Sequence, residues 1–360
     1  MIQENTLISE GEVIDRLVGR KDAYAPFEIT SVEREVLLGG RRLDARITLS
    51  WRGRAVPFLV EIKARTAPKL VTDAVLQLKS LVGNRKGNLL IVVPFLSKTI
   101  VEILEREGVS GLDLNGNYLI QTPEMSAIRL DRENEFTESQ AIKKIFSGNS
   151  SLVGRLFLTA KRRYQSVNEV CAAIRECGGS LSLSTVSKVL TGLENELIIE
   201  KGDAGISLLQ PEKLLQRLED GYRSPKVSAI MKVKLPPPWA TLLPPEWDSA
   251  AKTINNSLPP AASWAMSGES SASRYTLTTP AGIPAIFVTD FGSLAQFEED
   301  RFNNAILNRT QDSFPYFGAR ALPDLRWSSP VQCYLELSRL DKRERELAAT
   351  VRASILEGLK

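Results

Sequence analysis

The chain contains no histidine in its 360 residues. Without an imidazole it cannot build a Ser-His-Asp or Cys-His catalytic site, a zinc site with histidine ligands, or a nuclease centre in which histidine activates water. Hydrolytic chemistry would have to depend on carboxylates, lysine and a hard metal ion. The only cysteines are Cys171, Cys177 and Cys333. They are too few and too scattered for a disulfide framework or a thiolate metal site, so we expect reduced thiols in a cytoplasmic protein.

Long apolar runs are also missing. The first residues lack the apolar core of a signal peptide, and no stretch reaches the ~18 uncharged apolar residues of a membrane span. We therefore expect no membrane partner. The net charge of +3 is small, with 25% charged and 43% hydrophobic residues. A polyanionic partner is compatible with this balance, but any nucleic-acid surface must come from local clusters of cations.

The length predicts two or three domains, and the composition changes along the chain support three. Residues 1–145 mix strands with helices, residues 150–222 are mainly helical, and residues 224–360 follow the segment Tyr222–Pro225. The third segment contains a proline-rich stretch, Leu235–Trp247, that does not suit central strands. We expect a multidomain protein of mixed α/β and α+β type.

Periodicity gives the elements of the first segment. Apolar residues recur at helical spacing over residues 71–82, whereas NLLIVVPF at Asn88–Phe95 is the continuous apolar run of a central strand. Strands that alternate with helices predict an α/β sandwich. The other expected elements are a helix over Leu7–Val18, a strand over Val32–Leu38, a hairpin of Leu43–Trp51 and Ala55–Ala64 closed by Arg52-Gly53, a helix over Ser97–Glu107 and a strand over Leu112–Gln121.

Three charged residues interrupt the predicted hairpin. Glu61 and Lys63 are two residues apart, so they project from the same face of a strand while their apolar neighbours pack on the other. Asp44 lies on the facing strand, and its side chain projects from the face opposite to that of its apolar neighbours. Two carboxylates that approach one point repel each other unless a cation lies between them, and a hard divalent ion prefers oxygen ligands. A lysine beside them can hold a phosphate oxygen or orient an attacking water.

The combination of Asp44, Glu61-Ile62-Lys63 in an apolar strand and Gln77 on the next helix resembles the PD-(D/E)XK nuclease superfamily over about residues 5–125. The resemblance implies a restriction-endonuclease-like α/β domain and a Mg²⁺ or Mn²⁺ cofactor. It implies that Asp44 and Glu61 ligate the metal, that Lys63 contacts phosphate and water, and that Gln77 has an accessory role. Leu43 stands where many members have proline, and Glu12 is the candidate for an optional early acid.

A second interpretation of these residues stays open. A Glu-x-Lys pair on a sheet face is often a solvated ion pair of little energetic value, and domains of this type also serve as passive DNA-binding modules. The stretch GLDLNGNY at Gly111–Tyr118 also admits two interpretations. Its Asp and Asn side chains suit a metal or a phosphate, but a strand that ends in an Asn-Gly turn explains them more simply.

The second segment predicts a winged helix-turn-helix. Three helices over Leu152–Arg163, Val167–Cys177 and Ser184–Glu196 precede a predicted two-stranded hairpin within Leu197–Leu209. The pattern resembles winged helix-turn-helix repressors, in which Ser-Thr-Val-Ser-Lys opens the recognition helix. Small hydroxyls and a lysine suit a helix that enters the major groove. A winged helix used for protein pairing is the alternative. The expected DNA-binding residues are Arg162, Arg163, Ser184, Thr185, Ser187, Lys188, Thr191 and Lys201.

The third segment, with a predicted strand at Pro284–Thr289 and a closing helix over Ser329–Leu359, carries its own resemblance. WAMSGESSASR at Trp264–Arg274 and SSPVQCYLELS at Ser328–Ser338 resemble the C-terminal region of antitoxins from type IV, abortive-infection toxin–antitoxin systems. Ser271 and Glu336 replace an alanine and an aspartate of that pattern. The resemblance implies a mixed α/β domain with a regulatory role.

Two functions follow from these patterns, and a pure protein-interaction scaffold ranks third behind them. The first is a DNA-binding protein in which a winged helix holds double-stranded DNA and an N-terminal domain acts as a metal-dependent phosphodiesterase, an Mg²⁺-dependent DNA endonuclease. The alternative is a non-catalytic transcriptional regulator or type IV antitoxin-like protein with a protein toxin as partner. A homodimer is compatible with both.

Overall fold

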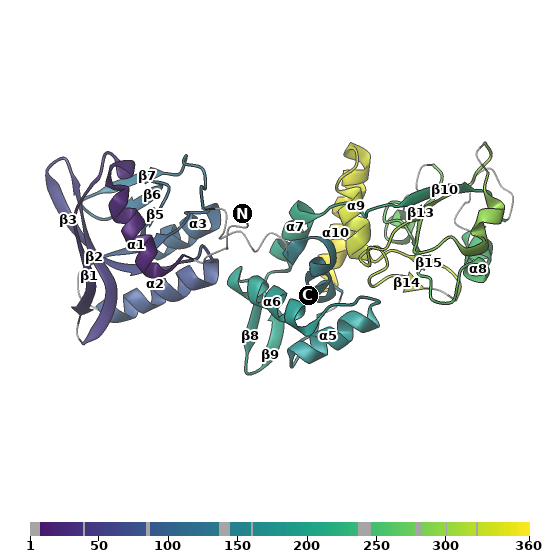
Figure 1. Ribbon diagram of the computed structural model, residues 1–360, viewed down its shortest axis with the longest axis horizontal. Coiled ribbons are helices and arrows are strands. Elements are labelled where there is room, and N and C mark those ends of the chain that lie inside the picture. The colour runs from purple at the N-terminus through teal and green to yellow at the C-terminus, as the bar shows by residue number, and fades with distance from the viewer. Residues whose placement is uncertain are drawn as a thin grey trace, which may run out of the picture. The chain divides into compact units, whose positions relative to one another are not determined.

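The computed structural model describes residues 8–38, 40–83, 87–136, 145–159, 161–236, 246–277, 282–299, 301–321 and 323–360. Two compact units make up the chain, Met1–Ile142 with Asn195–Leu197 and Lys143–Glu194 with Ile198–Lys360. Three sheets of seven, six and two strands are combined with helices, so the protein is a mixed α/β chain (Figure 1). Among the described residues, no helix is long and apolar enough to cross a membrane.

The first unit is built on a seven-stranded sheet in the order β1-β2-β3-β4-β5-β6-β7. The pairs β3–β4 and β4–β5 are parallel and the other neighbours are antiparallel. The strands are β1 (Glu28–Leu38), β2 (Arg41–Trp51), β3 (Arg54–Ile62), β4 (Asn88–Val93), β5 (Ser110–Asp113), β6 (Tyr118–Gln121) and β7 (Ser126–Arg129), and the helices are α1 (Glu10–Gly19), α2 (Pro68–Val82) and α3 (Lys98–Glu107), with a short 3-10 helix, η1, at Lys21–Tyr24.

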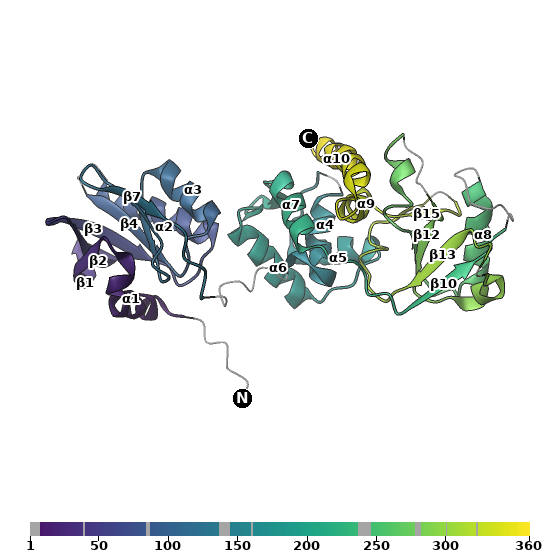
Figure 2. The same ribbon diagram turned by 90° about the horizontal axis from the view of Figure 1, so that it is seen from above.

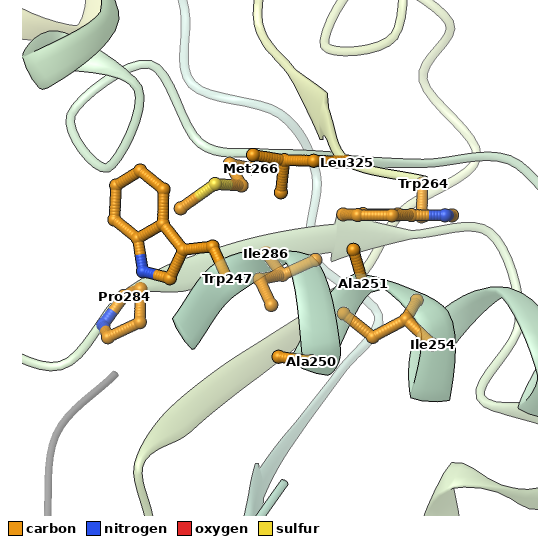
Figure 3. Close-up of a pocket in the computed structure, with 9 residues that line it drawn as sticks. All are labelled: Trp247, Ala250, Ala251, Ile254, Trp264, Met266, Pro284, Ile286 and Leu325. Carbon is orange, nitrogen blue, oxygen red and sulfur yellow. The ribbon is translucent and has the colours of Figure 1, made fainter. Parts of the chain in front are cut away.

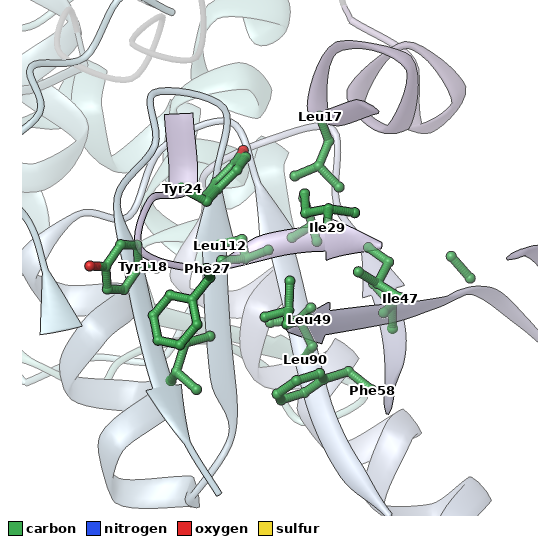
Figure 4. Packing of buried hydrophobic residues seen from close by; sticks show 14 of the residues in the cluster. Leu17, Tyr24, Phe27, Ile29, Ile47, Leu49, Phe58, Leu90, Leu112 and Tyr118 are labelled. Carbon is green, nitrogen blue, oxygen red and sulfur yellow. The ribbon is translucent and has the colours of Figure 1, made fainter. Parts of the chain in front are cut away.

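Two hydrophobic clusters cover the two faces of this sheet. One contains the buried side of α1 together with alternate residues of β2 and β3, and Figure 4 shows Leu17 of α1 above Ile47 and Phe58 of the sheet. The other combines the buried faces of α2 and α3 with Ile91 and Val93 of β4. Central strands covered on both faces must be apolar on both sides, which explains the continuous NLLIVV run of β4. The predicted α/β sandwich is therefore confirmed.

The turn and one strand of the first unit compare differently with their predictions. The hairpin turn is as expected, since Arg52 and Gly53 have φ of 51° and 77°, the left-handed pair that a two-residue β turn needs. The predicted strand Leu112–Gln121 is wrong, because it consists of two antiparallel strands, β5 and β6, with the Asn-Gly turn between them. The apolar residues on both sides of that turn made the two strands look like one.

The second unit begins with short helices (Figure 2) and a two-stranded hairpin, called the wing below (Figure 1). The helix predicted over Leu152–Arg163 ends early, because Tyr164 forms backbone hydrogen bonds in both directions with Ile206 of the wing, at 3.0 and 2.7 Å. The helix therefore ends at Phe157, and residues 161–163 before Tyr164 are not helical. The elements are η3 (Gly148–Ser150), α4 (Ser151–Phe157), α5 (Val167–Glu176), α6 (Leu183–Asn195), β8 (Ile199–Gly202), β9 (Gly205–Leu208) and α7 (Pro211–Gly221).

The remainder of the second unit is a six-stranded mixed sheet in the order β10-β13-β12-β11-β15-β14. The predicted strand at Pro284–Thr289 is confirmed as β12. The predicted closing helix is two helices, α9 and α10, separated at Ser338–Asp341. The elements are β10 (Ala229–Val233), α8 (Trp247–Ser257), β11 (Trp264–Met266), η5 (Ala272–Arg274), β12 (Ala285–Val288), η6 (Gly292–Phe297), β13 (Ala305–Arg309), β14 (Arg320–Ala321), β15 (Arg326–Trp327), α9 (Pro330–Leu337) and α10 (Lys342–Glu357).

Helix α8 packs on this sheet through Ala250, Ala251 and Ile254. Figure 3 shows these residues facing Trp264 and Ile286 across a narrow apolar pocket. Its volume of about 10 Å³ is room for roughly one water molecule, so the pocket is a packing gap of the core. Most of the proline-rich stretch, residues 237–245, lies outside the described residues.

Candidate functional site

The candidate site lies where β2 and β3 separate. Their pairing runs from Trp51 opposite Arg54 to Ala45 opposite Val60. Asp44 follows on β2, and its Oδ2 accepts a hydrogen bond of 2.7 Å from the backbone N–H of Ile62. A side-chain carboxylate therefore takes the place of the next main-chain acceptor, which fixes Asp44 beside the end of β3.

Glu61 is the buried acid of the site. Only 3% of its surface is exposed. Its Oε1 accepts a hydrogen bond of 2.9 Å from Nζ of Lys63, whereas its Oε2 is buried without a hydrogen-bond partner. Burial raises the pKa of Glu61, and the negative charges of Asp44 and Glu10 raise it further, against the opposing effect of Lys63. A buried carboxylate oxygen without a partner is costly, so this atom is a natural position for a cation.

Lys63 comes directly after β3 and is held by the sheet, since its backbone N–H donates to the carbonyl of Val92 at 2.9 Å. Its Nζ lies 2.9 Å from Glu61 and 3.4 Å from Oε1 of Glu10. Burial lowers the pKa of Lys63, but the bond to Glu61 and the charges of Glu61, Glu10 and Asp44 outweigh that effect and raise it. The amine is therefore a fixed cation that faces the carboxylate pair.

The donor set fits a hard divalent cation. Mg²⁺ in proteins is usually held by one or two carboxylates and completes its shell with waters and substrate phosphates. Asp44 and Glu61 supply two carboxylates, and the unpartnered Oε2 of Glu61 is available to a metal. No group of three or more His, Cys, Asp or Glu side chains within the described ranges is arranged to hold a metal ion. A cation at this site would thus have two side-chain ligands from the described residues, Asp44 and Glu61.

The structure places the accessory residues differently. Gln77 is exposed on α2, next to the buried Leu78, and no contact of Gln77 with the acidic pair is recorded within the described residues. Glu12 closes a capping box with Ser9 at the start of α1, with its Oε2 2.8 Å from the Ser9 backbone N–H. The acid of α1 that contacts Lys63 is Glu10. The capping-box pattern Ser-x-x-Glu already assigns Glu12 to the helix start, but the approach of Glu10 to a strand 53 residues away leaves no local signal.

The GLDLNGNY stretch forms a closed hydrogen-bond network. Oδ1 of Asp113 accepts from the backbone N–H groups of Asn115 and Asn117, at 2.8 and 2.9 Å, and Oδ2 accepts from the Leu96 N–H at 3.0 Å. The Asn117 side chain donates to Oδ2 at 2.8 Å. Burial raises the pKa of Asp113 while these donors oppose the shift. Because both oxygens are already used within the turn, the structural interpretation accounts for this motif.

In the segment predicted as a helix-turn-helix, α6 buries Val186, Val189, Leu190 and Leu193 on one side. The expected DNA-facing residues of α6 are on the other side, with Ser184, Ser187, Lys188 and Thr191 exposed and Thr185 half-buried. Two acidic residues of the same region do not add free negative charge to this exposed side: Glu196 is buried, and Glu194 pairs with Lys201 at 3.2 Å.

Two of the four expected cations already have acidic partners. Lys201 bonds Glu194 and also Thr191 Oγ1 at 3.2 Å, and Arg162 bonds Glu169 at 2.8 Å. Arg163 and Lys188 are exposed. The surface is therefore modestly basic, and a DNA phosphate would have to compete with two exposed or half-exposed ion pairs, which are individually weak.

The two motifs of the C-terminal segment are in direct contact. Oε2 of Glu336, on α9, accepts a hydrogen bond of 2.8 Å from the backbone N–H of Gly268, and Gln332 donates to its Oε1 at 2.6 Å. A Cβ at Gly268 would lie 2.8 Å from Cα of Cys333, so only glycine fits against this helix. Burial raises the pKa of Glu336 to about 7. The serine-glycine loop and the PVQCYLEL helix are thus one packing unit.

Comparisons with protein-family models and with curated proteins gave no match. Among solved structures, a repair endonuclease from Pyrococcus abyssi aligns with 31% of this chain at 20% identity and a TM-score of 0.22. A complex of EndoMS with dsDNA aligns with 31% at 22% identity and a TM-score of 0.22. EndoMS in its apo form aligns with 32% at 19% identity and a TM-score of 0.20. In each alignment the chain spans 48% of the length of the other protein.

Proposed function

We propose that this chain is a DNA-acting protein whose residues 1–145 form a PD-(D/E)XK-type, metal-dependent nuclease domain. Residues 150–222 form a winged helix for double-stranded DNA, and residues 224–360 form an antitoxin-like mixed α/β domain. The observation that carries the proposal is the geometry at the end of β3. There, Glu61 is buried with one oxygen unpartnered, Asp44 is fixed beside it, and Lys63 contacts the same carboxylate.

The chemistry of these side chains fits phosphodiester hydrolysis. A bound Mg²⁺ or Mn²⁺ would activate water and neutralise charge on the phosphate. Asp44 and Glu61 would hold that cation through oxygens that the sheet already positions. Lys63, fixed by the β4 main chain and kept protonated by its acidic neighbours, would hold a phosphate oxygen or orient the attacking water. No histidine is needed in this arrangement.

The test of nuclease activity uses the full chain with supercoiled and branched DNA in the presence of Mg²⁺ or Mn²⁺. We expect cleavage that falls by at least about a hundredfold in Lys63→Ala, Glu61→Gln and Asp44→Asn, since each removes a group that acts at the transition state. Lys98→Ala and Glu105→Gln, exposed substitutions on α3, should cleave like the wild type. Equal cleavage by all variants would refute the assignment of this site.

One observation favours the non-catalytic alternative, a transcriptional regulator or type IV antitoxin-like protein. Each charged group of the site already has a partner within the chain, because Ile62 N–H binds Asp44 and Lys63 pairs with Glu61 and Glu10. The serine-glycine loop packed on α9 also matches the two elements of the antitoxin resemblance. A protein toxin partner and a homodimer belong to this alternative. Intact DNA on every substrate, together with salt-dependent binding to its own promoter, would support it.

The winged helix has its own test. Lys188→Ala should weaken duplex binding, because a lysine on the exposed side of α6 contacts a DNA phosphate. The slope of log K against log salt concentration should fall by about one, which corresponds to one lost phosphate contact. Gel shifts at several salt concentrations measure both effects. Lys226→Ala, beyond the wing and α7, is the matched control. Unchanged affinity in Lys188→Ala would remove α6 as the DNA-facing helix.

A further inference from the structure

A cavity of about 260 Å³ lies within the second unit and contains none of the residues proposed above for metal or DNA. Its wall comes from segments far apart in the sequence: the ends of α4, α5 and α10, the start of α9, and the segment that leads into β14. The lining residues are Leu158, Thr159, Cys177, Tyr275, Gly318, Arg320, Ser329, Pro330, Val331, Ser354, Ile355, Gly358 and Leu359.

The cavity has an apolar floor and a polar rim. Leu158, Val331 and Ile355 are buried, whereas Thr159 and Arg320 are exposed at the surface. A cavity of about 150 Å³ is enough for benzene in a protein core, so this one has room for a substituted ring or a branched chain. A buried apolar floor with a few polar groups above it is the usual form of a small-molecule site.

The electrostatics of the cavity select an anion. Arg320 is the single charged residue among the described residues that line it. None of the ion pairs between described residues includes Arg320. The guanidinium lies over the ring of Tyr275, with Cζ 5.8 Å from the ring centroid. Helix α9 begins at the cavity with Ser329 as N-cap and Pro330 as its first residue, and a helix N-terminus adds partial positive charge.

We propose that this cavity binds a small organic carboxylate with an apolar body. A guanidinium offers two parallel N–H donors to a planar carboxylate, which is the strongest directional contact available to Arg320. The ring of Tyr275 and the floor residues would cover the apolar part of the ligand. A single cation matches a single negative charge, so a monoanion fits better than a polyphosphate.

Cys177 provides a built-in reporter of occupancy. Its thiol is half-buried in the cavity wall, whereas Cys171 and Cys333 are buried outside the cavity. Iodoacetamide should therefore alkylate Cys177 first in the native protein, and a ligand in the cavity should slow that reaction. Peptide mass spectrometry of the full chain reads all three cysteines, so alkylation of Cys171 and Cys333 reports any unfolding.

The probes are benzoate and 4-methylbenzoate, with 4-methylbenzamide and inorganic phosphate as comparison arms at equal ionic strength. We expect 4-methylbenzoate at about ten times its Kd to slow alkylation of Cys177 about tenfold. At that concentration, mass action leaves the cavity empty in only about one tenth of the molecules. Arg320→Gln should abolish the protection. Arg326→Gln, which removes an exposed arginine from the paired strand β15, should retain it.

Isothermal titration calorimetry with 4-methylbenzoate gives a second measurement that does not depend on thiol reactivity. The proposal is supported if the wild type and Arg326→Gln release or absorb heat on binding and Arg320→Gln does not. Equal protection by the neutral amide would overturn the role of charge, and equal protection by phosphate would overturn the role of the apolar floor. No binding of either carboxylate, by protection or by heat, would overturn the site. None of these outcomes depends on nuclease activity.

Discussion

Two buried carboxylates in the first unit show how hydrogen bonding separates a structural acid from a candidate ligand. Both carboxylate oxygens of Asp113 accept hydrogen bonds, so neither oxygen lacks a partner. Glu61 has a lysine on one oxygen and no partner on the other. The pKa of each is raised by burial. The difference in partners, not the shift, identifies Glu61 as the group that needs a further ligand.

Asp113→Ala should lower the free energy of unfolding by about 3–5 kcal/mol, because it leaves several buried N–H groups without an acceptor. The loss should be the same with and without Mg²⁺, since the network is internal. Chemical denaturation in both conditions measures this. Asp131→Ala, an exposed acid in the same unit, is the control with a loss of less than about 0.5 kcal/mol. A dependence of the loss on Mg²⁺ would revive the metal interpretation of this turn.

The sequence predicts those contacts of the site that join residues close together in the chain, and not those that join residues far apart. Strand alternation places Glu61 and Lys63 on one side of β3, and their contact at 2.9 Å agrees with that pattern. The roles of Asp44, Glu61, Lys63 and Gln77 stay predictions. The bond from Ile62 to Asp44 depends on where two strands separate, and the approach of Glu10 depends on how α1 crosses the sheet. Neither has a signature in local periodicity.

At the scale of elements, the long periodic helices and the hairpin could be predicted, whereas breaks within apolar stretches could not. Helix α3 and the turn at Arg52-Gly53 carry local signals. The division of Leu112–Gln121 into β5 and β6 has a local cause, the Asn-Gly turn, which the apolar residues on both sides obscure. The division of Ser329–Leu359 into α9 and α10 depends on tertiary contacts. At the first break, Asp113 binds the backbone of the turn. Just before the second, Glu336 anchors α9 to the serine-glycine loop.

Helix α9 should make stability depend on pH through Glu336. Its folded-state pKa is about 7, against 4.5 as the ordinary value, so between these pH values the folded protein retains a proton that the unfolded chain has lost. The free energy of unfolding therefore falls as pH rises through this window, by about 3 kcal/mol from this group. Burial is the largest cause of the raised pKa of Glu336; hydrogen bonds from Gln332 and two backbone N–H groups oppose it, and the charge of Glu269 adds a smaller rise.

Glu336→Gln should remove that slope. Urea unfolding of wild type and variant at about pH 5 and about pH 8 gives the difference directly, since other titrating groups cancel in the comparison. Glu346→Gln, an exposed acid on α10, should keep the wild-type slope. A parallel pH dependence in Glu336→Gln and wild type would show that Glu336 is ionised in the folded protein at acid pH.

At the scale of the whole molecule, helices α4–α7 with β8 and β9, the segment predicted as a winged helix, belong to one compact unit with the C-terminal sheet. A buried polar chain joins them. Arg155 of α4 donates to Oε1 of Gln332 on α9 at 2.7 Å, and Gln332 donates onward to Glu336 at 2.6 Å and to Tyr222 at 3.1 Å. Burial lowers the pKa of Arg155 to about 10. The three-domain division stays a prediction, and these contacts indicate that its second and third parts are coupled.

The coupling can be measured with Arg155→Met and Gln332→Leu. Gln332→Leu removes the acceptor of Arg155 Nη1, while Arg155 Nε keeps its bond to Ser151 Oγ, and this should cost about 3–5 kcal/mol because a buried cation loses a partner. The double variant removes the charge as well, so it should recover part of that loss, with an interaction energy of about 0.5–3 kcal/mol. The distant exposed pair Arg163→Met and Arg343→Met should be additive within about 0.5 kcal/mol.

Hydrogen exchange then decides whether the coupling extends through the unit. Gln332 lies on α9, so a purely local effect of Gln332→Leu would increase exchange in α9 and leave α5 and α6 unchanged. If the winged helix and the C-terminal sheet unfold together, amides of all three helices must lose protection by the same free energy, because one opening exposes them all. We expect the second result. A winged helix that keeps its protection while α9 loses its own would establish two independent domains joined by a polar contact, and would restore the division at residues 222–224.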